Sequence, residues 1–118
     1  MIFLKYMNKC EINYFISKTG ENPIKNFLDK HPKVKVKTFH IFLNIEKYGL
    51  ISAIPHIKKL KNTPLWEIKI VGKESTRILY FSENQNSILL LHAFIKKTQR
   101  TPIKEINIAL KRLSQVKY

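Results

Sequence analysis

Apolar and polar residues alternate with a two-residue period in some segments of the chain and with a helical period in others. Residues 10–17 alternate Ile12, Tyr14 and Ile16 with more polar neighbours, which is typical of a strand. Three further strand-like runs follow at 65–71 (LWEIKIV), 76–82 (TRILYFS) and 87–95 (SILLLHAFI). The polar sequences GKES and ENQN between these runs are typical of turns. The last run is apolar on both parities, so we expect a central strand covered on both faces.

Helical spacing predominates between the first strand and the middle of the chain. Asn22 is a favoured N-capping residue, and Pro23 is well tolerated in the first helical turn, so a helix is expected to begin there. It must end before Pro32, because a proline disfavours helical geometry in the preceding residue. A longer amphipathic helix is expected over residues 33–48, with Gly49 as its C-cap. Two helices joined at a proline predict a helical hairpin.

The rest of the chain completes the prediction of the fold. Residues 50–64 contain two prolines and a group of basic residues, and we expect a connector there. Thr101-Pro102 opens a C-terminal helix. The resulting order is strand, two helices, three meandering strands and helix. This order predicts the α+β class, with an antiparallel sheet flanked by the N-terminal helical hairpin and the C-terminal helix.

Length and composition restrict the class of protein further. A chain of 118 residues with 44% hydrophobic residues is expected to form one domain, 1–118. Cys10 is the single cysteine, which fits a reducing compartment. No run approaches the about 20 apolar residues of a membrane helix, and the N-terminal MIFL lacks the features of a signal peptide. We therefore expect a protein of the cytoplasm.

The charge is strongly positive and unevenly distributed. Lys and Arg number 22 against 8 Asp and Glu, giving a formal net charge of +14. Basic residues gather in segments 30–37, 56–61 and 96–118, whereas acidic residues gather nowhere. This pattern predicts a polyanionic partner, either nucleic acid or an acidic protein. A membrane surface is not expected, because the apolar faces are needed for the core.

The sequence does not contain the motifs typical of metal binding, phosphate-loop nucleotide binding or a nucleophile elbow. The four histidines, His31, His40, His56 and His92, do not have metal-ligand spacing, so no metal is expected. No glycine-rich phosphate loop and no nucleophile elbow is present. We expect no cofactor.

The remaining candidates for a functional site are the cationic residues on and beside the predicted strands. Glu67 and Lys69 share one strand face, Arg77 opens the next strand, and Lys96 and Lys97 follow the last one. Fixed cations of this kind bind a phosphodiester and stabilise the charge that develops in its transition state. RNA supplies its own nucleophile, the 2′-hydroxyl. A lysine among other cations has a lowered pKa and could act as general base.

Structural interpretations compete with these functional ones. Trp66 shares its face with Ile68 and Ile70, which favours a core position over stacking on a base. Tyr80 and His92 likewise share parity with apolar residues, and packing is favoured for both. For Glu67 an ion-pair partner and a general base both stay open.

The residues that carry these features also resemble a known family. LWEIKI (65–70), RILYF (77–81) and LLLHAFIKKTQRTP (89–102), together with ENPIKNFLDK (21–30) and EKYG (46–49), resemble the phage-derived branch of HigB-like toxins in the RelE/ParE superfamily. The resemblance covers about residues 7–115, so residues 1–6 are either an extension or an alternative start. It implies a toxin of a type II toxin–antitoxin system that cleaves mRNA on the translating ribosome without a metal, docks on ribosomal RNA, and is neutralised by a helix-turn-helix antitoxin.

The resemblance also assigns roles to individual residues. It implies that Lys69, Arg77 and Lys97 bind the phosphate and stabilise the transition state, with Lys96 and Gln99 as neighbours. Together with the residues singled out above, the catalytic candidates are Lys69, Arg77, Lys97 and Glu67, and the RNA-binding candidates are Lys96, Gln99, Arg100, Trp66, Lys58 and Lys59. Glu67 stands where some members carry another lysine, and no tyrosine occurs in 98–107, where some place a catalytic one. These departures leave the general base and acid unassigned. A gyrase-inhibiting ParE-like toxin and a non-catalytic nucleic-acid-binding module remain the alternatives.

Overall fold

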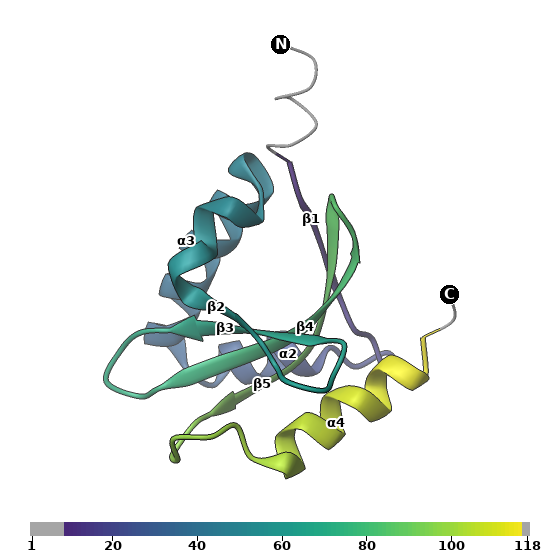
Figure 1. Ribbon diagram of the computed structural model, residues 1–118. Coiled ribbons are helices and arrows are strands. Elements are labelled where there is room, and N and C mark those ends of the chain that lie inside the picture. The colour runs from purple at the N-terminus through teal and green to yellow at the C-terminus, as the bar shows by residue number, and fades with distance from the viewer. Residues whose placement is uncertain (1–8, 117–118) are drawn as a thin grey trace.

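In the computed structural model, which describes residues 9–116, one β-sheet carries helices on both faces (Figure 1). In chain order the elements are β1 (Glu11–Tyr14), α2 (Pro23–Asp29), α3 (Pro32–Tyr48), the 3₁₀ helix η1 (Leu50–His56), β2 (Ile57–Lys59), β3 (Leu65–Ile70), β4 (Thr76–Asn84), β5 (Ser87–Ile95) and α4 (Ile103–Ser114). No helix within residues 9–116 has the length and apolar character needed to cross a membrane. The expectation about residues 1–6 lies outside the described residues.

The five strands lie in the order β1-β5-β4-β3-β2. Strands β2 to β5 pair antiparallel, whereas β1 pairs parallel with β5. The predicted α+β class and the flanking helices are confirmed, and the sheet is mixed rather than wholly antiparallel. The alternation within β1 predicts a strand but not the direction of its partner, which depends on the long connection between them. β5 lies between β1 and β4 and is mostly buried, as its apolar sequence predicts.

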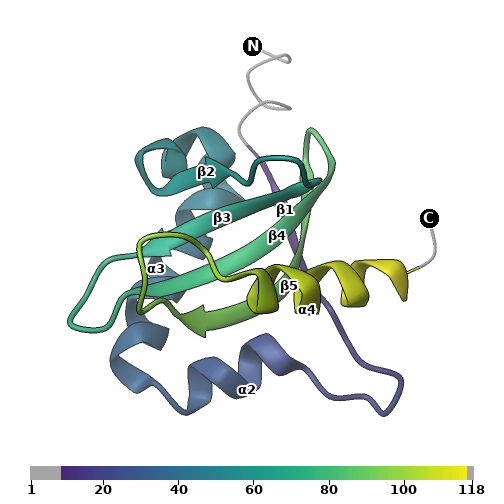
Figure 2. The same ribbon diagram turned by 60° about the horizontal axis from the view of Figure 1, so that its bottom comes forward.

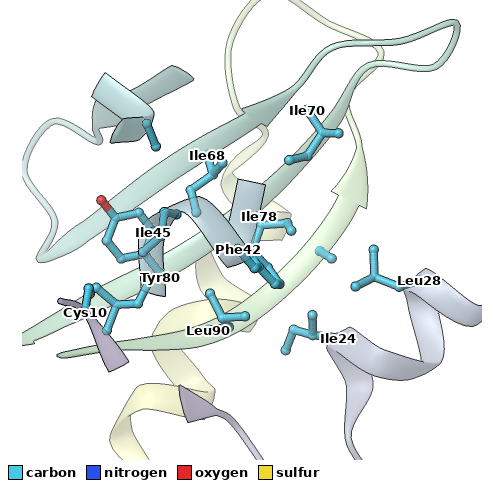
Figure 3. Close-up of a cluster of buried hydrophobic side chains, with 13 residues drawn as sticks. Cys10, Ile24, Leu28, Phe42, Ile45, Ile68, Ile70, Ile78, Tyr80 and Leu90 are labelled. Atoms are coloured by element: carbon cyan, nitrogen blue, oxygen red, sulfur yellow. The ribbon is translucent and has the colours of Figure 1, made fainter. Parts of the chain in front are cut away.

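Two hydrophobic clusters hold the helices against the two faces of the sheet. The cluster under α2 and α3 includes Ile24, Leu28, Phe42, Ile45, Ile68, Ile70, Ile78, Tyr80 and Leu90 (Figure 3). The cluster under α4 includes Leu65, Leu79, Leu89, Leu91, Phe94 and Ala109. Figure 2 shows α4 in front of the sheet, over β4 and β5. α4 covers only part of this face of the sheet, because Lys58 on β2 and Lys69 on β3 are exposed.

The helix ends follow the predicted capping chemistry. The side chain of Asn22 accepts a hydrogen bond from the backbone N–H of Lys25 at 3.0 Å, so Asn22 is the N-cap of α2. Gly49 ends α3 with φ of 82°, a backbone conformation that costs glycine little. Both predicted helices are confirmed, and α3 begins one residue earlier than expected, at Pro32.

The main difference from the sequence prediction lies in residues 50–64. This segment contains the 3₁₀ helix η1 and the short strand β2 instead of an irregular connector. β2 has three residues, two of them exposed lysines, so it carries no hydrophobic alternation. Its pairing with β3 depends on backbone hydrogen bonds, which a local sequence pattern does not reveal.

Candidate cationic site

The strand register brings charged residues of β2, β3 and β4 onto the same face of the sheet. Lys69 lies directly opposite Arg77, and Lys58 lies directly opposite Glu67. Residues directly opposite one another in a ladder point to the same face, and so do residues two apart along one strand. These four side chains therefore share the face that α4 covers in part, as the predicted parity of Glu67 and Lys69 requires.

Glu67 and Arg77 form an ion pair that is almost completely withdrawn from water. Arg77 Nε lies 3.6 Å from Glu67 Oε1, and the two side chains are 10% and 3% exposed. Thr101 donates a hydrogen bond from Oγ1 to the same Glu67 oxygen at 2.9 Å. Of the two roles left open for Glu67, the ion pair is present in the structure.

Further hydrogen bonds fix the guanidinium of Arg77. Its Nη1 donates to Ser75 Oγ at 2.6 Å and to the carbonyl oxygen of Thr76 at 3.1 Å. A planar guanidinium that donates to several fixed acceptors at once loses little further freedom when it meets an anion. Arg77 is therefore a rigid positive charge just beneath the surface.

Lys96 joins this group from the end of β5. Its backbone N–H donates to the carbonyl oxygen of Ser75 at 2.6 Å, which holds residue 96 beside the start of β4. Partial burial lowers the pKa of the Lys96 amine. The Glu67 carboxylate opposes this shift, whereas the charges of Arg77 and two neighbouring lysines add to it. Four cations, Lys58, Lys69, Arg77 and Lys96, thus surround one carboxylate; we call them the cation cluster.

The loop between β5 and α4 supplies other candidates at the same end of the sheet. Lys97, Gln99 and Arg100 are exposed on it. The side chain of Lys97 forms no ion pair or hydrogen bond with any residue in 9–116, so the lysine that meets the cluster is Lys96. Thr101, which the sequence analysis missed, also comes from this loop. The one sequence feature that could have drawn attention to Thr101 is its position directly before Pro102, where a helix is expected to begin.

Trp66 and Lys59 lie on the opposite face, away from Lys69 and Arg77. They are register partners, and Trp66 stacks on Tyr80 with ring centroids 6.4 Å apart and packs against the cluster under α2 and α3. The amine of Lys59 donates to the carbonyl oxygen of Thr63. The structure therefore does not bring Trp66 and Lys59 together with Lys58 and Lys69, because adjacent strand residues point to opposite faces.

His92 occupies a satisfied, partly buried position, as the packing interpretation predicts. Its Nε2 lies 2.9 Å from Glu105 Oε2, and Arg112 Nη1 lies 3.2 Å from its Nδ1. Arginine can only donate, so Nδ1 accepts and Nε2 carries the proton. Burial lowers the pKa of His92, in agreement with a neutral ring. These contacts tie α4 to β5.

Within residues 9–116, no group of three or more His, Cys, Asp or Glu residues is placed to hold a metal ion. The fold and the cation cluster define a small basic α+β protein with a group of positive charges on one face of its sheet. The family model of phage-derived Gp49-like proteins (DUF891) matches residues 25–114, more than half of the chain, and the chain belongs to this family. The sequence matches none of the curated proteins compared with it. The Gp49-like family is of the RelE/HigB toxin type, so the resemblance found in the sequence is confirmed at this level.

Proposed function

We propose that the protein is the toxin of a type II toxin–antitoxin system and acts in the cytoplasm as a metal-independent, ribosome-dependent mRNA endoribonuclease of the HigB kind. The family membership supports the toxin role. The observation that carries the nuclease role is the cation cluster, which converges around a buried Glu67–Arg77 pair. Fixed charges at such a position stabilise a phosphoryl transition state without having to reorganise.

In the proposed reaction the 2′-oxygen of the RNA attacks the adjacent phosphorus and the bond from phosphorus to the 5′-oxygen breaks. The products are a 2′,3′-cyclic phosphate and a 5′-hydroxyl. Exposed Lys69 binds the non-bridging oxygens, and rigid Arg77, 8% exposed, places a second charge below them. Lys96, whose pKa is lowered, accepts in its neutral form the proton that leaves the 2′-hydroxyl, and water protonates the 5′-oxygen as it departs. Lys97, Gln99 and Arg100 hold the flanking RNA from the loop, with Lys58 at the rim.

The test is to incubate the purified protein with translating ribosomes and to map the ends of the mRNA. We expect codon-positioned cuts with 2′,3′-cyclic phosphate ends, which disappear in Lys69→Ala and Arg77→Ala. Lys111→Ala, which removes an equal charge from an exposed position on α4, is the matched control and should cut normally. Products with 5′-phosphate ends would exclude the 2′-hydroxyl mechanism.

Expression in cells and measurements of RNA affinity separate the two alternatives. Intact messages together with DNA damage and stalled replication on expression would favour a gyrase-inhibiting toxin. A graded loss of RNA affinity for each lysine removed, without growth arrest, would favour a non-catalytic nucleic-acid-binding module.

The toxin type implies an antitoxin partner. We propose that this partner is a helix-turn-helix protein that covers the cation cluster with an acidic segment, while other basic surface docks on ribosomal RNA. Complementary charge at an interface accelerates association and makes it sensitive to salt. Lys69→Glu should therefore slow association with the antitoxin, whereas Lys111→Glu should leave it nearly unchanged. Equal effects of the two substitutions would place the interface elsewhere.

A further inference from the structure

A second basic feature lies next to the cation cluster, at the C-terminal end of β3. A groove of about 410 Å³ opens between α3 and the C-terminal end of β3. Its apolar wall includes Val36 and Val71, whose exposed fractions of 72% and 58% are high for valine. The basic residues of its rim are Lys37, His40, His56 and Lys69, and none of the lining residues is acidic.

The groove is continuous with the cation cluster through Lys69, which belongs to both. β2 pairs with β3 at residues 66–68, so no strand formed by residues 9–116 covers that edge of β3 from Lys69 onward. The Lys37 amine donates to the carbonyl oxygen of Val71 at 3.0 Å, which holds a second cation at this uncovered edge. An extended anionic chain bound at Lys69 can therefore pass over the edge of β3 into the groove without crossing another element.

We propose that this groove binds the base and phosphate of a nucleotide next to the bond that is cut, an inference that rests on the proposed nuclease function. Val36 and Val71 offer an apolar surface to the face of the base. The rings of His40 and His56 can stack or form hydrogen bonds with its edges, which is how proteins recognise unstacked single-stranded RNA. Lys37 and Lys69 bind the phosphates on either side. The volume falls within the roughly 300–1,000 Å³ typical of ligand sites.

An RNA strand is favoured over a peptide as the occupant for two reasons. The groove combines four basic side chains with no carboxylate, and it adjoins the proposed site of phosphodiester cleavage. An acidic peptide of the antitoxin would also match the positive charge of the groove, and the test below distinguishes it from RNA.

The test uses the full chain and a short single-stranded oligoribonucleotide with 2′-deoxyribose at the cleavage position, so that binding is measured without cleavage. Val36→Asp places a carboxylate in the groove, and we expect it to weaken binding about tenfold. Leu43→Asp makes the same kind of change at an exposed position of the same helix and should have little effect. His40→Ala removes a rim group without adding charge and should alter the base preference next to the cut. Thermal unfolding checks that each variant is folded.

The outcomes separate this proposal from the nuclease proposal. Normal binding and an unchanged cleavage pattern in Val36→Asp and His40→Ala would overturn the groove as an RNA site. If those variants instead weaken only the complex with the antitoxin, the occupant is a peptide and the proposal is wrong. Groove-dependent RNA binding by a wild-type protein that cuts no message would support the groove and contradict the nuclease.

Discussion

Glu67 and Arg77 lie diagonally across β3 and β4, with Arg77 Nε 3.6 Å from Glu67 Oε1, although their direct register partners are Leu79 and Lys69. The diagonal contact turns Arg77 toward a carboxylate that is itself anchored by Thr101. One buried pair therefore links the strands to the loop before α4, and it fixes the position of a cation at the proposed site.

Removing one member of this pair should destabilise the protein strongly. Glu67→Ala leaves the Arg77 charge buried without its partner, which typically costs about 3–5 kcal/mol in the free energy of unfolding. Chemical denaturation measures the loss. The double variant Glu67→Met/Arg77→Met removes both charges and should recover much of the stability. A single variant within about 0.5 kcal/mol of the wild type would show that the pair contributes little.

Replacing Lys96 by arginine should separate binding from catalysis. Lys96→Arg keeps the positive charge but removes a group with a lowered pKa, so RNA affinity should persist while the cleavage rate falls about 100-fold or more. In the wild type the rate should rise with pH as the Lys96 amine loses its proton. Lys111→Arg, the same change at an exposed position of α4, is the matched control and should cut at the wild-type rate. Cleavage by Lys96→Arg at the wild-type rate would assign the proton transfer to another group.

Protonation of His92 should weaken the fold. Burial lowers its pKa in the folded state, so the unfolded state takes up the proton at higher pH. The contribution of His92 to the free energy of unfolding is therefore complete above its usual pKa of about 6.5 and decreases as the pH falls through the lowered value. Denaturation between pH 8 and pH 5 (roughly the window around that pKa) measures the slope. His92→Gln should flatten it, whereas His40→Gln at an exposed position should not. Identical slopes in all three proteins would contradict this account.

Cys10 should react slowly with alkylating reagents while the protein is folded. Its side chain is buried, and burial raises the pKa of the thiol to about 11, so very little of the reactive thiolate is present near neutral pH. Mass spectrometry after brief iodoacetamide treatment should show little modification of the native protein and complete modification in denaturant. Equal rates in the two states would mean that Cys10 is accessible.

Much of the local structure is determined by the sequence itself. Helical periodicity and caps such as Asn22 and Gly49 determine where α2 and α3 lie, because capping and side-chain burial act within one or two turns. The two-residue period of a strand places Glu67 and Lys69 on one face and Trp66 on the other. The sequence also carries the toxin-type family signature.

The tertiary structure alone decided which distant residues meet. The parallel pairing of β1 with β5 and the contact of Thr101 with Glu67 join segments far apart in the chain. Lys96 rather than Lys97 meets the cation cluster because the end of β5 is held by its backbone contact with Ser75. The hydrophobic periodicity that predicts helices and strands depends only on residues close together in the sequence. These contacts depend instead on how whole helices and strands pack together.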